Sequence, residues 1–265
     1  MNRIITNILA SFIPSKSKRR SFRRRCKNQK PLSLNNRFVL IRESGEEILY
    51  PKIAGLDVIF NGKNSLVKIY EPCKFENTIL QLGDDNVVEI KKTKYSITNF
   101  VMPYTMRKNS KLFIGENFSC VGCNYFCHDE PNTIVKIGND CMFSFGITMW
   151  PSDGHTILDS NGNCINKGED IFIGNHVWVG MNSTLLKGSF IPENSVVGAC
   201  SVFTKNSNLD ENFKTGGEGV ASPLRKNSDG GIIFAGIPAK KIKSNINWDR
   251  FNCYDYELRL KNGEK

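Results

Sequence analysis

Large apolar residues recur at every sixth position between residues 171 and 205. The run consists of Ile173, Val179, Leu185, Ile191, Val197 and Phe203. A small or short side chain stands four positions after each of the first five, namely Val177, Ser183, Ser189, Ser195 and Ser201. In a repeat of this period each hexad makes one short strand and one turn, and three hexads close a triangular coil. Neither an amphipathic helix nor simple strand alternation has this spacing. The pattern predicts a left-handed parallel β-helix.

The hexad register also predicts which side chains point inward. We expect the large aliphatic residue to face the interior of the prism and the small residue to fill the corner beside the next turn. Glycine follows the apolar residue directly at Gly174, Gly180 and Gly198, where it relieves the backbone of the turn.

The same register returns upstream with interruptions. Leu82 is followed six residues later by Val88, Ile114 by Cys120, and Ile137 by Phe143 and then Met149, with Cys141 in a small slot. We therefore expect loops to break the coil at about 91–111, 121–134 and 150–170.

These patterns predict an all-β dominated chain with a short N-terminal helix and a C-terminal capping helix. The apolar residues Trp248, Phe251, Tyr254 and Leu258 indicate the capping helix, because an open β-helix end exposes unpaired strand edges. The expected divisions are an amphipathic and basic tail (1–30), lead-in strands (31–60), the β-helix (61–205), a polar, glycine-rich loop insert (206–231) and the cap (232–265).

Charge is concentrated at the N-terminus. Residues 1–30 hold ten Lys and Arg and no acidic residue, while the remaining residues hold 26 of each sign. Apolar residues at helical spacing before this basic run favour peripheral attachment to an anionic membrane surface. A solvated tail without function and a nucleic-acid arm are the alternatives, but the neutral body carries no nucleic-acid motif. No stretch approaches 18 apolar residues, so no transmembrane helix is expected.

Cysteines and histidines are the candidates for chemistry. Nine cysteines, an odd count, favour reduced thiols in the cytoplasm. The spacing of Cys120, Cys123 and Cys127, followed by His128, suggests zinc, but Cys120 falls at an inward coil position, so no metal is expected.

Histidine is the natural base at neutral pH. His155 lies where the six-residue register breaks, in a loop able to carry it outward, although a surface histidine without function would look the same. Alternation along the strand turns His176 and Trp178 outward and Val177 inward. An exposed tryptophan marks a contact surface, for a ligand or for a neighbouring subunit.

Five segments follow one another in a characteristic order and spacing, namely 152–159, 171–180, 186–188, 197–205 and 235–242. In this order and spacing the chain, over roughly residues 110–243, resembles bacterial hexapeptide O-acetyltransferases, most closely those acting on capsular polysaccharide and polysialic acid. The chain departs from the family at Phe203, where valine is more usual, and in the long insert 206–231.

The resemblance implies a homotrimer with active sites between adjacent prisms and acetyl-CoA in the groove. His155 would be the general base and Trp178 would position the acetyl thioester. Gly180 and Ala199 would line the pantetheine channel, and the phosphates would meet basic side chains, namely Lys205, Lys240 and Lys241.

The leading hypothesis is therefore acetyl transfer, without an acyl-enzyme, to a hydroxyl of a bacterial capsular polysaccharide, including sialic-acid-containing polymers. A cytoplasmic location follows, with the basic tail as a contact to the inner membrane face or the capsule machinery. The alternatives are N-acetylation of a nucleotide-linked amino sugar, a β-helix carbonic anhydrase with three histidines on zinc, and a non-catalytic polysaccharide-binding scaffold.

Overall fold

The computed structural model describes residues 34–208 and 230–263, together with Ser11, Phe12, Pro14 and Arg19. The expected N-terminal helix, nearly all of the basic tail and most of the 206–231 insert lie outside the described residues. Among the described residues no helix is long and apolar enough to span a membrane.

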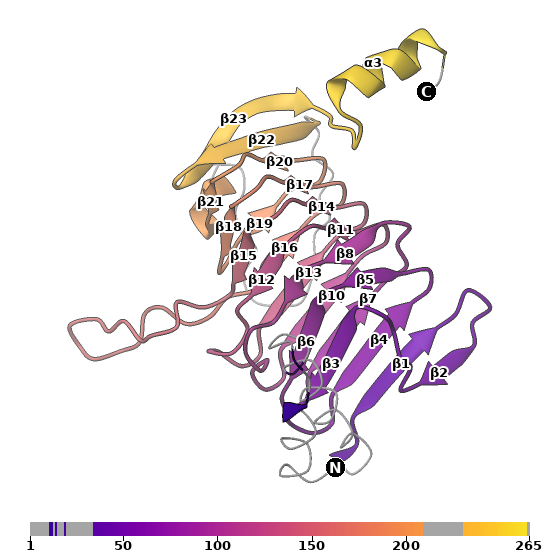
Figure 1. Ribbon diagram of the computed structural model, residues 1–265. Helices are drawn as coiled ribbons and strands as arrows, with labels where there is room; N and C mark the ends of the chain where they lie inside the picture. Colours follow the sequence, from indigo (N-terminus) through magenta and orange to yellow (C-terminus); the bar gives the residue numbers. More distant parts are fainter. Residues whose placement is uncertain (1–10, 13, 15–18, 20–33, 209–229, 264–265) are drawn as a thin grey trace.

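The described chain winds into a prism with three β-sheet faces (Figure 1). Sheet A contains β1 (Arg37–Ile41), β2 (Glu47–Leu49), β4 (Leu66–Tyr70), β7 (Val87–Ile90), β10 (Lys111–Ile114), β13 (Ile134–Ile137), β16 (Ile171–Ile173) and β19 (Phe190–Ile191). Sheet B contains β3 (Leu56–Phe60), β6 (Thr78–Leu82), β9 (Phe100–Val101), β12 (Cys123–Tyr125), β15 (Ile147–Trp150), β18 (Thr184–Leu186) and β21 (Val202–Phe203). Sheet C contains β5 (Lys74–Glu76), β8 (Ser96–Thr98), β11 (Ser119–Cys120), β14 (Met142–Phe143), β17 (Trp178–Val179), β20 (Val196–Val197), β22 (Gly231–Gly236) and β23 (Ala239–Ile246).

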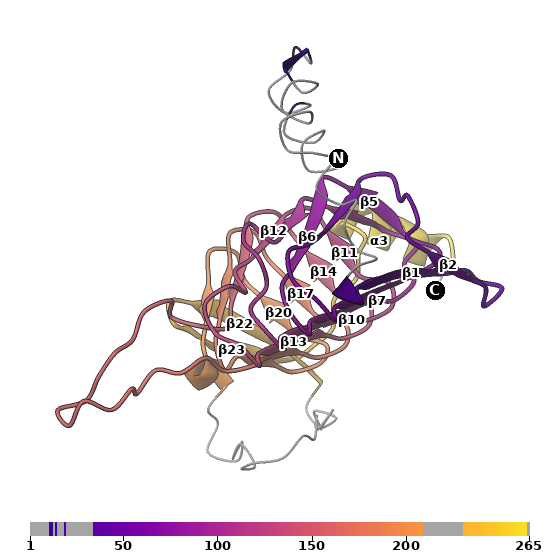
Figure 2. The same cartoon turned by 90° about the horizontal axis from the view of Figure 1, so that it is seen from below.

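The left-handed parallel β-helix expected from the hexads is confirmed. Within each sheet, strands of successive coils pair in parallel and in register, so that Ile137 lies opposite Ile173, and Ile173 opposite Ile191. The large residues of the hexad run are 0–3% exposed and together form one continuous core. Figure 2 shows the coils that enclose this core, seen from below.

The small residues fill the corners as predicted. Ser183, Ser189 and Ser195 are fully buried. Their hydroxyls find acceptors: Ser183 donates to the carbonyl of Gly198 at 2.9 Å, and Ser189 to that of Phe203 at 3.0 Å. A buried hydroxyl needs such a partner, because its desolvation is otherwise uncompensated.

A left-handed residue directly precedes most of these corner side chains. Asn182 and Asn194 have φ of 56° and 60°, a conformation that asparagine tolerates better than most residues. Aspartate takes the same place at Asp140 (φ 54°) and histidine at His176 (φ 53°). This asparagine-before-serine signal is visible in the sequence and marks the corners independently of the apolar period.

The coil starts earlier than residue 61. Arg37 of β1 pairs in parallel with Leu66 of β4, and Leu56 of β3 with Thr78 of β6, so residues 37–60 form the first coil rather than lead-in strands. The six-residue period does not predict this first coil, because β2 pairs antiparallel with β1 and stands where the coil would otherwise have its sheet C strand. Likewise β8, β9 and β12 continue the coil through the expected breaks at 91–111 and 121–134, whereas the loop at 151–170 leaves the prism.

The C-terminal end of the coil is covered by a hairpin. The single-turn helix η2 (Lys205–Asn208) follows the last coil, and β22 continues sheet C in parallel with β20 while β23 returns antiparallel. Phe234 of β22 packs edge-on against Phe203 at 5.1 Å between ring centroids. The expected C-terminal helix is present as α3 (Cys253–Lys261), but none of its residues is buried and it extends from the body (Figure 1).

Candidate active site

Trp178 lies on the outer surface of sheet C, as predicted, with Val177 beside it fully buried. The tryptophan is 38% exposed. Two residues further along, Gly180 turns the corner toward sheet B, directly against the next coil. A Cβ on Gly180 would stand 2.7 Å from the backbone nitrogen of Ala199, so a side chain there would collide with the neighbouring coil. Trp178, Gly180 and Ala199 therefore share one edge of the prism.

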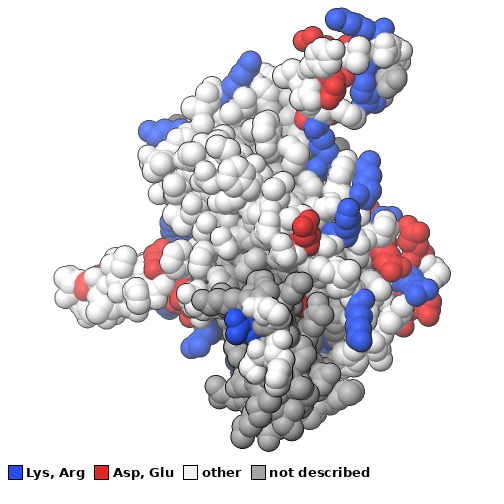
Figure 3. Space-filling model, viewed as in Figure 1, with Lys and Arg blue, Asp and Glu red and all other residues white. Residues whose placement is uncertain are grey.

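His155 lies on a different side of the molecule. It is exposed and belongs to the long loop 151–170, which leaves the prism between β15 of sheet B and β16 of sheet A (Figure 1). In the space-filling view this loop stands clear of the body (Figure 3). The corner from which it leaves is opposite the sheet C face that carries Trp178. A single chain therefore does not bring the two predicted site residues together.

Asn166 and Lys187 join the two ends of this loop where it leaves the prism, and we call their contacts the loop clasp. The side-chain amide of Asn166 donates to the backbone carbonyl of His155 at 2.8 Å and to the carboxylate of Asp153 at 3.0 Å. Its side-chain oxygen accepts from the amide of Ile157 at 2.7 Å. Lys187, on the body, pairs with Asp153 and donates to the carbonyl of Asn166 at 2.8 Å. The backbone on both sides of His155 is thereby fixed to the prism.

The clasp depends on an ionised Asp153. Burial of the carboxyl works against ionisation, but the hydrogen bonds from Lys187 and Asn166, together with the charge of Lys187, outweigh it. The pKa of Asp153 is therefore lowered from its ordinary value.

His176 is engaged by neighbours on both sides of its ring. Nδ1 lies 2.8 Å from a carboxylate oxygen of Asp140, and Nε2 lies 3.0 Å from the backbone carbonyl of Trp248. The ring stacks on that of Trp248 at 4.2 Å with an interplanar angle of 10°, and the indole N–H of Trp248 donates to the carbonyl of His176 at 2.9 Å. With both nitrogens occupied, His176 holds the C-terminal segment on the coil and is poorly placed to accept a substrate proton.

Arg250 completes this attachment. Its guanidinium donates to Asp140 at 3.1 Å, to the hydroxyl of Ser119 at 2.6 Å and to the carbonyls of Asn117 and Cys141 at 3.0 and 3.1 Å. Its side chain is only 16% exposed. The segment that Arg250 anchors places the ring of Trp248 6.2 Å from that of Trp178. The C-terminal segment therefore contributes to the surface around Trp178.

The three predicted phosphate-binding lysines do not form one cluster of adjacent side chains. Lys205 begins η2 and pairs with Glu169 of the 151–170 loop at 2.9 Å. Lys240 and Lys241 lie on β23, opposite Ala235 and Phe234 of β22, at the end of sheet C. Strand β23 and η2 are in contact, so the lysines belong to the same end of the prism.

The cysteine motif next to His128 does not converge on a metal site. Cys120, Cys123 and Cys127 are each about 2% exposed and lie in the core. Burial raises the pKa of Cys120 to about 12 and that of Cys123 well above its usual value, whereas a zinc ligand must be a thiolate. Within the described ranges no three potential ligands come together.

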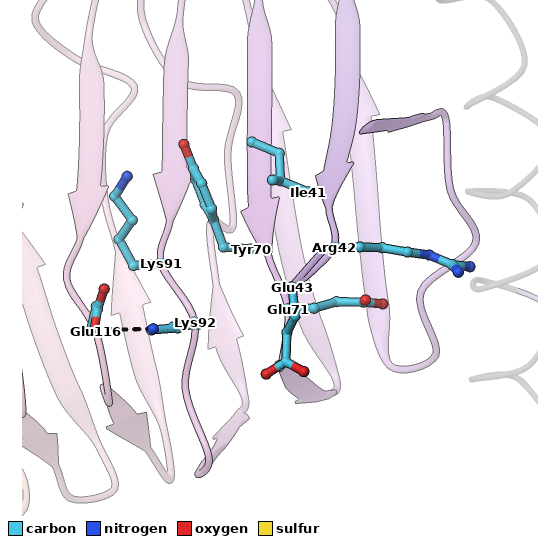
Figure 4. Close-up of a pocket in the computed structure, with 8 residues that line it drawn as sticks. All are labelled: Ile41, Arg42, Glu43, Tyr70, Glu71, Lys91, Lys92 and Glu116. Carbon is cyan, nitrogen blue, oxygen red and sulfur yellow. Dashed lines mark ion pairs between the residues drawn. The ribbon is translucent and has the colours of Figure 1, made fainter. Parts of the chain in front are cut away.

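A surface pocket lies at the N-terminal end of the prism, next to β1 and away from the sheet C edge that carries Trp178 (Figure 4). It is lined mainly by charged side chains, with Lys92 and Glu116 4.0 Å apart and the Lys91 ammonium 4.0 Å from the centre of the Tyr70 ring. None of the predicted site residues lines it.

Sequence reasoning missed Asn166, Lys187, Asp140 and Arg250 as parts of the site, and took Trp248 only for a capping residue. Their partners are 9 to 133 residues away in the chain, and no local period marks them. The one available signal is the asparagine and charged residues that border the break in the hexad register.

No protein-family model matches the chain. It is 32% identical over 128 residues to the polysialic acid O-acetyltransferase of Neisseria meningitidis (48% of this chain, 58% of the relative). It is 34% identical over 145 residues to the polysialic acid O-acetyltransferase of Escherichia coli O1:K1 (54% and 39%) and 31% identical over 107 residues to the galactoside O-acetyltransferase of Escherichia coli K12 (39% and 50%). The chain thus spans about half the length of the curated relatives that it matches.

Two solved structures match almost throughout. The polySia-specific acetyltransferase NeuO superposes with a TM-score of 0.59 at 28% identity, covering 85% of this chain and 94% of that one. The polysialic acid O-acetyltransferase OatWY superposes with a TM-score of 0.58 at 25% identity, covering 86% and 96%. The chain is a homologue of the polysialic acid O-acetyltransferases and shares their hexapeptide-repeat fold.

Proposed function

We propose that this protein is an acetyl-CoA-dependent O-acetyltransferase that acts on a hydroxyl of a bacterial capsular polysaccharide. The observation that carries the proposal is the near full-length match to two polysialic acid acetyltransferase structures, together with an exposed histidine whose loop is held at its root. Polysialic acid, named for both relatives, is the first acceptor to consider.

His155 acts as the general base. It accepts the proton of the acceptor hydroxyl as the oxygen attacks the thioester carbonyl, so that a new C–O bond forms. The tetrahedral intermediate then expels the CoA sulfur, which takes the proton from His155 as the C–S bond breaks. A positioned histidine contributes roughly 10²–10⁴-fold to such a step. Orientation of the two substrates supplies much of the remaining acceleration.

The edge with Trp178, Gly180 and Ala199 binds acetyl-CoA. The exposed indole positions the acetyl end, and the glycine lets the pantetheine arm approach the backbone closely. Lys240 and Lys241, at the end of sheet C, meet the CoA phosphates as compact point charges. Lys205 joins them when it exchanges its partner Glu169 for a phosphate.

The active protein is a homotrimer. His155 and Trp178 lie on opposite sides of one prism, so a complete site needs the loop of one subunit beside sheet C of the next. An exposed apolar stripe supports this assembly: Val121, Phe145 and Met181, 57%, 50% and 41% exposed, occupy the corner between sheets C and B in three consecutive coils. Large exposed apolar residues in an unbroken row are typical of subunit contacts.

Release of free thiol from acetyl-CoA tests the function. The protein is incubated with polysialic acid and with a panel of other capsular polysaccharides, and thiol is expected to appear only with an acceptor. His155→Ala should lower the rate by about 10²–10⁴-fold, while Thr156→Ala, a neighbouring exposed position, should not. If no acceptor in the panel releases thiol, the function is wrong. If His155→Ala retains full activity, the assignment of the base is wrong.

A further inference from the structure

Aromatic side chains form a row on the outside of sheet B. Tyr104 follows β9, Phe126 follows β12 and Trp150 ends β15, so one ring comes from each of three consecutive coils. The ring centroids are 6.3 Å apart between Tyr104 and Phe126 and 5.2 Å apart between Phe126 and Trp150. His128 lies against the row, 4.2 Å from the Tyr104 ring. We call these four residues the aromatic wall.

The wall is held in place by one carboxylate. Asp129 accepts from the indole N–H of Trp150 at 2.8 Å, and its other oxygen lies 3.3 Å from Nε2 of His128. Asp129 is therefore occupied by its neighbours, and its side chain is only 16% exposed. The rings remain accessible: Tyr104 is 53% exposed, and Phe126 and Trp150 are half-buried. The result is a rigid apolar surface with a phenol, an imidazole and a carboxylate along its rim.

This wall begins beside the proposed general base. A Cβ on Gly154 would lie 3.4 Å from Cζ2 of Trp150 and 3.9 Å from Asp129, and Gly154 directly precedes His155. From there the wall runs along the prism axis, away from the loop, with the strand spacing of about 4.8 Å per coil. A molecule whose hydroxyl reaches His155 would therefore extend over the rings of Phe126 and Tyr104.

We propose that the aromatic wall is the binding surface for several consecutive sugar units of the acceptor. Sugar rings have an apolar C–H face and a rim of hydroxyl groups. Aromatic rings stack on the apolar face, and polar side chains at their edges bind the hydroxyl groups. Since three coils each contribute a ring, the wall suits an extended saccharide better than a single sugar. Stacking does not depend on charge, so the wall accepts neutral and anionic chains alike. This inference rests on the proposed function, because it assigns the acceptor side of the same site.

A second copy of this chain is the competing occupant. The exposed stripe of Val121, Phe145 and Met181 lies at another position, the corner between sheets C and B, and already provides an apolar contact surface. The aromatic wall instead lies next to the loop that carries His155, and its polar rim suits hydroxyl groups better than a dry subunit contact.

Acetylation of polysialic acid fractions of defined length tests the wall, with acetyl-CoA saturating. Tyr104→Ala should raise the KM for long chains about tenfold, with kcat changed less than about twofold. The increase should shrink for the shortest acceptor that is still acetylated. Tyr104→Phe, which keeps the ring, should restore most of the affinity. Tyr254→Ala, which removes a 75% exposed tyrosine from α3, is the matched control and should leave both constants unchanged.

A binding measurement separates this inference from the proposed function. Intrinsic tryptophan fluorescence, to which Trp150 contributes, is recorded on addition of unacetylated polymers from the same capsular panel, without acetyl-CoA, in the wild-type and Tyr104→Ala proteins. Binding that Tyr104→Ala weakens supports the wall even if no acetyl transfer occurs, in which case only the proposed function fails. An unchanged KM and unchanged binding in Tyr104→Ala would overturn the wall, as would absence of binding to every polymer. A changed oligomer mass in this variant would instead identify the wall as a subunit contact and also overturn the inference.

Discussion

The side-chain amide of Asn166 donates a 2.8 Å hydrogen bond to the backbone carbonyl of His155, eleven residues earlier in the chain. The same side chain binds the amide of Ile157, so it fixes the backbone that directly follows the side chain of the proposed base. A catalytic group works only when its geometry is held within a fraction of an ångström. We therefore expect the proposed site to depend on Asn166, a residue that has no chemical role in the reaction.

Asn166→Ala should lower kcat about tenfold while the KM for acetyl-CoA stays close to that of the wild type. Asn166→Asp keeps the acceptor for Ile157 but removes the donor to His155, and it places a second carboxylate beside Asp153. It should therefore be no better than alanine. Steady-state kinetics check both variants, with Asn161→Ala at the tip of the same loop as the control. Wild-type kcat in Asn166→Ala would show that the clasp does not position the base.

Mixing two inactive variants should recover activity. His155→Ala and Trp178→Ala each damage one side of the site that we propose two subunits build. In every trimer that contains both variants, one of the three sites then combines an intact His155 with an intact Trp178. Co-expressed, differently tagged subunits purified over both tags provide the sample, and thiol release is the measurement. If the mixture is no more active than either parent, both residues act within one subunit or one of them lies outside the site.

Arg250→Ala should release the C-terminal segment from the coil. The change removes a buried guanidinium that satisfies two backbone carbonyls and the carboxylate of Asp140, which costs about 2–4 kcal/mol of local stability. Hydrogen exchange should rise across residues 246–263 and around His176, while the coil core stays protected. Lys261→Ala, at the exposed C-terminal end of α3, is the control. Unchanged exchange in Arg250→Ala would contradict the anchoring role.

The loop clasp should persist at neutral pH and fail in acid. The folded pKa of Asp153 lies below the unfolded value of about 3.9, so its stabilisation is complete above that pH and is lost as pH falls through the folded pKa. Exchange protection of the Ile157 amide, followed by NMR below pH 5, reports the transition. Lys187→Gln removes the charge that lowers this pKa and should move the midpoint upward. An identical midpoint in the two proteins would rule out the ion pair as the cause.

The hexads of 171–205 determined the architecture because the information is local. Each six-residue unit specifies its own strand, its own inward side chain and its own corner, and stacking repeats that unit. The same period did not predict the coil formed by residues 37–60, because the β2 hairpin interrupts the six-residue spacing there. The parallel pairing of β1 with β4 and of β3 with β6 is nevertheless intact.

The hexad register and the alternation along the strand likewise predicted that Trp178 faces outward, and the resemblance identified His155 as the base to test. Neither decided how far apart these residues lie. The tertiary structure did so, because the direction in which a loop leaves a prism depends on which corner it leaves from. His176 also faces outward by register, but Asp140 and Trp248, 36 and 72 residues away in the chain, occupy its two ring nitrogens. Contacts between residues so far apart depend on how whole coils stack, so the six-residue period cannot predict them.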